Sequence, residues 1–248
     1  MYIQVGINLV LNSAMEKLWI MVNGLQLIVI IPLLPVKLPP NTQMILVAFI
    51  DFACFDLVPV DLIYPSIFDF LDSDPFNFEF QSAGYDSGYL PENMGTVFTF
   101  THIFALALLI SLPLYLLKNK SRCAKKTYAR FKSALMWNPV VIFFLEGFME
   151  IALCAMAVIK RWDWNSDPNS HINIIYALIY MIIVLLYPII TTVIFCRNKH
   201  LIDKKIFRRY VGGPFDGLKR NHKNRNIFYV TYYMARRVIF VITVVLVE

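Results

Sequence analysis

The stretch "INIIYALIYMIIVLLYPIITTVIFC", residues 172–196, decides the class of protein, because none of its side chains is charged. An α-helix needs roughly 20 apolar residues to cross the hydrocarbon core of a bilayer, and this stretch is long enough. The chain as a whole is 58% hydrophobic and 16% charged, whereas soluble domains are about half apolar and one quarter charged. The sequence therefore predicts an integral membrane protein.

Five further stretches are apolar enough to be membrane segments: residues 18–36, 44–60, 95–117, 135–159 and 227–247. The last of these is interrupted by one basic pair. We therefore predict an all-α fold, a polytopic transmembrane helical bundle of about five to six membrane helices. These helices would form a single multi-pass domain over residues 1–248. Because the chain starts without a signal peptide and stops on an apolar stretch, we expect a fragment of a longer protein.

Charge is segregated between the loops. Residues 118–134 carry seven basic residues and no acid, and residues 197–226 carry ten basic residues against two acidic ones. Basic loops stay on the cytoplasmic side, so both are predicted to be inner loops. The outer side is then predicted to carry the acidic loop 64–94 and the short connection 160–171. The net charge of +6 is thereby explained by inner loops and needs no nucleic-acid partner.

The stretch 44–60 is ambiguous because it contains Asp51, Asp56 and Asp61. Five residues advance a helix by about 140°, so these carboxylates do not share one face. The stretch either spans the membrane as a plain helix with Asp61 at its outer end, or it re-enters and lines a cavity.

Two carboxylates lie inside the apolar stretch "VIFFLEGFMEIAL", residues 141–153, at Glu146 and Glu150. At about 1.5 Å per residue, Glu146 lies roughly 16 Å from the inner boundary. Arg237, counted from the inner end of the last apolar stretch, lies about 13 Å deep. Since an ionised side chain near the bilayer centre costs roughly 2.5–3.5 kcal/mol, we predict that Glu146, with Glu150, pairs with Arg236 or Arg237.

Such a charge cluster has two interpretations. It either locks the helices in register, or its carboxylates form a cation or proton path with Asp51 and Asp56 as secondary members. No repeated polar stripe marks the other helices, which favours the lock. For His102, the sequence likewise favours a packed, hydrogen-bonded side chain over a proton relay.

The inner loop 197–226 contains a short amphipathic stretch with basic residues that we expect to contact anionic lipid of the inner leaflet. These residues are Lys204, Lys205, Arg208 and Arg209. Cys123 and Cys196 are juxtamembrane and are either plain thiols or palmitoylation sites. No enzyme, cofactor or metal-binding motif is present, so we expect neither an enzyme nor a cofactor.

Several stretches together resemble the C-terminal multi-pass membrane domain of large ciliate surface proteins, which is distantly similar to TRP-like membrane proteins. The stretches are "LWIMVNGLQLIVIIPLLPVKLPPN", "FIDFACFDLVPVDLI", "GYDSGYLPENMGT", "MWNPVVIFFLEGFMEIAL" and "FDGLKRNHKNRNIFYVTYYMARRVIFV". The resemblance implies a cysteine-rich or EGF-like ectodomain before residue 1 and further spans after residue 248. It also implies a location in the plasma membrane.

Two functions follow as hypotheses. The first is a membrane domain that anchors and organises a larger surface protein, with the Glu/Arg cluster locking helix packing. The second is a TRP-like cation channel or lipid-handling transporter that uses the intramembrane carboxylates. Fold resemblance alone does not choose between them.

Overall fold

The computed structural model describes residues 28, 31–34, 38–53, 74–135, 140, 143–145, 147–161, 168–201 and 223–247. Within these ranges the regular structure is entirely helical, as predicted. The elements are the 3-10 helix η1 (Ile31–Leu33) and the helices α2 (Pro40–Ala53), α4 (Phe78–Ser82), α5 (Leu90–Asn93), α6 (Gly95–Leu117), α7 (Arg122–Leu135), α9 (Phe148–Arg161), α10 (Pro168–Arg197) and α12 (Lys223–Val247).

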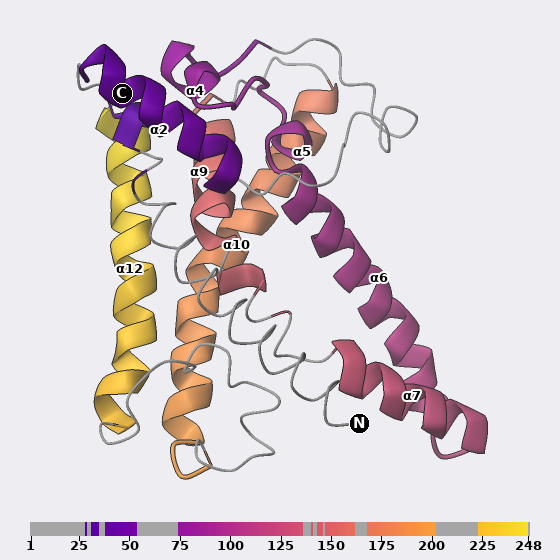
Figure 1. Cartoon of the computed structure of the whole chain (residues 1–248). Helices are drawn as coiled ribbons and strands as arrows, with labels where there is room; N and C mark the ends of the chain where they lie inside the picture. The colour runs from indigo at the N-terminus through magenta and orange to yellow at the C-terminus, as the bar shows by residue number, and fades with distance from the viewer. Residues whose placement is uncertain are drawn as a thin grey trace, which may run out of the picture.

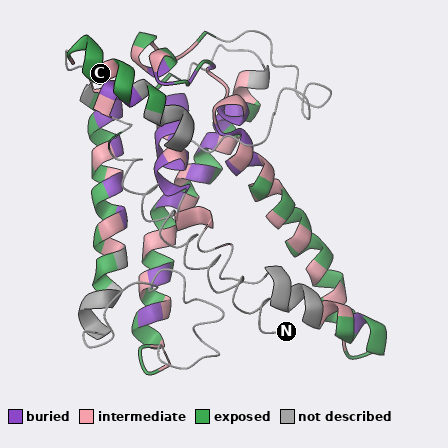
Figure 2. Cartoon of the chain, viewed as in Figure 1, coloured by how far each residue is buried: buried purple, intermediate pink, exposed green. Residues whose placement is uncertain are grey.

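Helices α9, α10 and α12 pack against one another and form the centre of the fold (Figure 1). α9 is the most enclosed of the three, because the large majority of its residues are buried. α12 contributes one buried stripe, at Met234, Arg237, Val241 and Val244, which recur at the three- and four-residue spacing of a single helix face. The buried faces of the three helices meet in one continuous core (Figure 2).

Two helices are long and apolar enough to cross a membrane, namely α6 and the part of α10 from Ser170 to Arg197. Only 11% and 22% of their most apolar windows are buried, so neither is the enclosed core helix of a soluble protein. Leu108, Leu109 and Leu116 of α6 are each about two-thirds exposed. Large exposed apolar surfaces of this kind mark contact with another molecule or with a membrane.

α6 diverges from the central helices along its length, and α7 folds back from its far end (Figure 1). The turn between them is closed by hydrogen bonds from the Lys120 and Ser121 backbone N–H groups to the Leu117 carbonyl, at 3.0 and 3.1 Å. The end of α6, helix α7 and the end of α10 lie at one end of the molecule, whereas α2, α4 and α5 lie at the other.

The end formed by α2, α4 and α5 is held by local caps and by a small aromatic core. The Asn77 side chain caps α4 by accepting a hydrogen bond from the Phe80 N–H at 2.7 Å, as short polar residues do at helix N-termini. The Phe80 ring lies 5.6 Å from Phe76 and 5.7 Å from Tyr85, measured between centroids. α2 runs across this end of the molecule instead of alongside α10 and α12 (Figure 1).

The predicted apolar stretches match the helices of the structure to different degrees. The stretch 95–117 coincides with α6, and 172–196 and 227–247 lie within α10 and α12. The prediction of five to six membrane helices exceeds what the described residues contain, since only α6 and α10 have both the length and the apolar composition. Most of the stretch 18–36 lies outside the described residues.

Two further stretches differ from the sequence expectation. Within the stretch 135–159 the structure describes the end of α7 at Leu135, residues 140 and 143–145, and α9 from Phe148 onward. The Gly147 N–H donates to the Phe143 carbonyl and the Ile151 N–H to the Gly147 carbonyl, both at 2.9 Å, so helical hydrogen bonding continues through Gly147. The basic stretch 118–134, expected to be a loop, is mostly helix α7. Because its basic residues recur at helical spacing, one face of α7 can be solvated while the other face packs.

Candidate functional site

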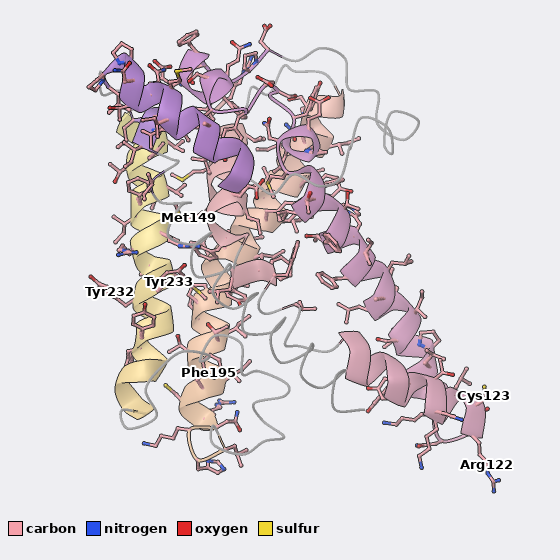
Figure 3. All side chains as sticks on the ribbon, in the orientation of Figure 1. Arg122, Cys123, Met149, Phe195, Tyr232 and Tyr233 are labelled. Carbon is pink, nitrogen blue, oxygen red and sulfur yellow. The ribbon has the colours of Figure 1, made fainter. Side chains whose placement is uncertain are left out.

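The guanidinium of Arg237 lies at the centre of the buried stripe of α12. Its side chain is 0% exposed and is the largest fully buried side chain of the described residues. The guanidinium carbon lies 4.3 Å from the centroid of the Tyr233 ring, one helical turn earlier. Figure 3 shows Tyr233 pointing toward α9 and α10, whereas Tyr232 points away from them. A cation over a ring face gains about 0.5–2 kcal/mol.

Arg236, the other arginine that the prediction offered as a partner, is not part of this buried stripe. Its side chain is exposed, because one residue rotates the helix by about 100° and carries it away from the stripe. Among the described side chains of α12, Arg237 is therefore the buried basic one.

The register between α9 and α12 is set by a contact near the ends of both helices. The Lys160 ammonium of α9 donates a hydrogen bond to the Val245 carbonyl of α12 at 2.6 Å. Both helices run toward the same end of the molecule (Figure 1). Counting back at about 1.5 Å per residue, Glu150 lies roughly 15 Å below Lys160 and Arg237 roughly 12 Å below Val245. The two charged residues are therefore at nearly the same level.

Glu150 is half-buried and lies in the first turn of α9. A helix N-terminus stabilises a carboxylate by about 0.3–1 kcal/mol, so the helix itself offsets part of the cost of this charge. Glu146 lies outside the described residues. Of the two predicted carboxylates, Glu150 is therefore the one that the described residues place at the level of Arg237.

A second polar group, Asn173 of α10, joins the helices to the segment before α5. Its Oδ1 accepts a hydrogen bond from the Leu90 N–H at 2.9 Å, and its Nδ2 donates one to the Gly88 carbonyl at 3.0 Å. The Asn173 side chain is buried. Asn173 lies where the polar run 165–171 passes into the apolar stretch, so it carries no distinct sequence signal, and sequence reasoning missed it.

At the same end, the guanidinium of Arg161 donates hydrogen bonds to the carbonyls of Asp74 and Pro75. The charged groups of Lys160 and Arg161 therefore donate hydrogen bonds to backbone carbonyls that lie outside the hydrogen-bonded turns of a helix. A charged donor makes a stronger hydrogen bond than a neutral one, so this end of α9 anchors both α12 and the segment before α4.

His102 is packed and hydrogen-bonded, as predicted. Its Nδ1 lies 2.8 Å from the Phe98 carbonyl and its Nε2 lies 3.2 Å from the Tyr176 hydroxyl. Because a carbonyl only accepts, Nδ1 carries the proton and Nε2 of the neutral ring accepts from Tyr176. Phe98 packs edge-on to Tyr176 with centroids 5.1 Å apart. The group joins α6 to α10.

Several predicted residues cannot be placed in this site. Asp51 lies in α2, but its side chain is outside the described residues, as are Asp56, Lys204, Lys205, Arg208 and Arg209. Cys123 and Cys196 are both exposed. In the described ranges, no group of three or more His, Cys, Asp or Glu side chains is arranged to hold a metal ion.

The site can therefore hold a positive charge inside the helices and bring a carboxylate to its level. Comparison of the chain with protein-family models, curated proteins and solved structures finds no match. The resemblance to ciliate surface proteins and to TRP-like membrane proteins consequently stays a prediction from the sequence.

Proposed function

We propose that this chain is a multi-pass membrane domain that anchors and organises a larger surface protein, with Arg237 and Glu150 locking α12 against α9. The observation that carries the proposal is the complete burial of Arg237 in the middle of the packed face of α12. An unpaired buried charge costs several kcal/mol, so a carboxylate at the same level is the partner that the chemistry requires.

The other buried polar groups support packing over transport. Asn173 makes its hydrogen bonds to the Leu90 and Gly88 backbone. The Thr191 hydroxyl donates to the carbonyls of Tyr187 and Pro188 at 2.8 and 3.0 Å. Both carbonyls lie in the preceding turn of the same helix, where threonine hydroxyls commonly bond. These groups serve the helices themselves.

The placement in the membrane follows from the exposed apolar faces of α6 and α10 and from the charge of their ends. We assign the end with α7 and Arg197 to the cytoplasmic side, because basic residues concentrate there. In this arrangement α12 also spans: its 25 residues measure about 37 Å. The plasma membrane is the proposed location, and Lys204, Lys205, Arg208 and Arg209 are proposed to face anionic lipid.

Transport is the competing function, and one observation speaks for it. Glu150 is half-buried, so its carboxylate is not sealed from its surroundings as Arg237 is. A cation or proton path could use such a group. A TRP-like channel or a lipid-handling transporter would be the corresponding protein class.

The two functions are separated by measuring delivery and flux in parallel. A reporter domain is fused before residue 1 and its amount at the cell surface is measured, while the purified chain is placed in liposomes that contain a fluorescent cation indicator. The anchoring function predicts surface delivery of the reporter and a cation flux equal to that of empty liposomes. Cation flux that Glu150→Gln abolishes without lowering delivery contradicts anchoring.

A further inference from the structure

The corner between α6 and α7 encloses an ammonium group between two aromatic rings. The Lys118 Nζ lies 3.6 Å from the centroid of Tyr115 on α6 and 5.8 Å from that of Tyr128 on α7. The two rings are 5.6 Å apart and nearly edge-to-face, at 63°. We call Tyr115, Lys118 and Tyr128 the elbow cage. Because its rings come from both helices, the cage fixes the direction in which α7 leaves α6.

α7 has two faces of different chemistry. Ala124 is buried and Tyr128, one turn later, is half-buried, so this face lies toward α6. Arg122, Lys125 and Lys126 are exposed. At 100° per residue Arg122 and Lys126 lie within about 40° of each other on the opposite side, and Lys125 lies on the flank between that side and Tyr128. Figure 3 shows Arg122 and Cys123 at the outer tip of this helix.

The segment of α6 that leads into the elbow is apolar and uncovered. Leu112 is 60% exposed and Leu116 is 68% exposed, yet three residues after Leu117 the chain reaches the exposed Lys120. An apolar helix that ends in tyrosine and lysine has the composition of a membrane–water boundary, where tyrosine and snorkelling lysine concentrate. The elbow cage would then lie at the level of the lipid headgroups.

We propose that the elbow of α6 and α7 binds the anionic headgroup of a phospholipid of the inner leaflet, with Lys125 and Lys126 as its main contacts and Lys118 held ready by the cage. Charge complementarity supports this occupant, because residues 118–134 contain seven basic side chains and no acid. An amphipathic basic helix lying in the interface attracts anionic lipid. The inference rests on the proposed membrane placement and concerns residues other than Lys204–Arg209.

The test measures lipid selectivity beside α7 in the whole chain. A fluorophore is attached to Cys123, which is exposed, after the other three cysteines are replaced by alanine. The protein is placed in phosphatidylcholine vesicles that contain spin-labelled phosphatidylserine or, at the same mole fraction, spin-labelled phosphatidylcholine. We expect stronger quenching by phosphatidylserine. Lys125→Gln with Lys126→Gln should lower the relative association constant about fivefold for each removed charge.

The matched control removes the same charge from the same end of the molecule. Arg197→Gln with Lys199→Gln, exposed positions at the last residue of α10 and just after it, should leave the selectivity at Cys123 unchanged. Tyr128→Leu should reduce the selectivity, whereas Tyr128→Phe, which keeps the ring, should retain it. Equal quenching by the two lipids, or an equal loss in the control, overturns the inference.

Failure of the membrane placement gives a different result. A chain that does not span the membrane would be removed from the vesicles by alkaline carbonate, and both proposals would then fall. A chain that resists extraction but shows no preference for phosphatidylserine overturns the lipid site alone. Vesicle flotation before each measurement separates the two outcomes.

Discussion

Replacing Arg237 by methionine removes the buried guanidinium and keeps an unbranched apolar chain in the packed face of α12. If Glu150 is its partner, Arg237→Met leaves a carboxylate beside the packed helices without its counter-charge. Removing one member of a buried ion pair costs about 3–5 kcal/mol. For a chain of this size each kcal/mol lowers the melting temperature by about 2–4 °C, so we expect a fall of roughly 6–20 °C.

The second substitution decides which carboxylate is involved. Replacing both members of a buried pair by apolar residues is often neutral or stabilising, so Glu150→Met should restore most of the stability that Arg237→Met removes. The register set by Lys160 and Val245 places Glu150 at the level of Arg237, and Glu146 is the other carboxylate of the prediction. Glu146→Met should therefore give no recovery.

The assay is thermal unfolding of the purified chain in detergent, followed by tryptophan fluorescence, with size-exclusion chromatography to confirm one species. Arg236→Met is the matched control, because Arg236 is exposed and surface substitutions change stability by about 0.5 kcal/mol or less. The reasoning is refuted if Arg237→Met melts together with Arg236→Met, or if Glu146→Met restores stability and Glu150→Met does not.

Other contacts give predictions that the same assay checks. Asn173→Leu leaves two backbone groups at the α5 end without their partner, at about 1–3 kcal/mol each, so its melting temperature should fall by at least about 4 °C; Asn198→Ala, which removes only a contact within its own helix end, should change it by less than half as much. Tyr176→Phe removes the hydroxyl that His102 accepts from and should cost about 0.5–1.5 kcal/mol; an unchanged melting temperature would contradict that bond. Gly147→Leu should destabilise more than Gly147→Ala, because a Cβ there already approaches the Phe143 carbonyl and the Val97 side chain at 3.4 Å; equal melting temperatures would count against this close approach.

Long apolar stretches could be read from the sequence almost to the residue. The stretch 95–117 matches α6 and 172–196 lies inside α10, because an uncharged run of this length has few alternatives to a helix. The location of α9 was harder to predict. Hydropathy continues across residues 135–159, whereas α9 begins at Phe148, and composition alone does not mark that start.

Helix α7 was missed although its signal was present. Ala124, Tyr128, Phe131 and Leu135 recur at helical spacing among basic residues, a pattern that charge counting alone obscures. The level of Glu150 relative to Arg237 could not be predicted from depth in the membrane. Depth compares each helix with the membrane, whereas the contact between Lys160 and Val245 compares two helices directly and brings Glu150 to the level of Arg237.

The contact of Asn173 could not be predicted either, because its partners lie more than eighty residues away in sequence. A buried polar side chain needs a partner, and the sequence does not say which backbone group will be in reach. The prediction that His102 is packed and hydrogen-bonded was correct. Its partner, Tyr176, could be identified only from the contact between α6 and α10.

The central claim, that the helices cross a membrane with their basic ends on the inner side, is tested most directly by the accessibility of Cys123. This thiol is exposed at the tip of α7, and Asp86→Cys supplies an exposed position at the opposite end. A membrane-impermeant maleimide applied to intact cells should label Asp86→Cys, and should label Cys123 only after the membrane is permeabilised. Labelling of Cys123 in intact cells would contradict the account.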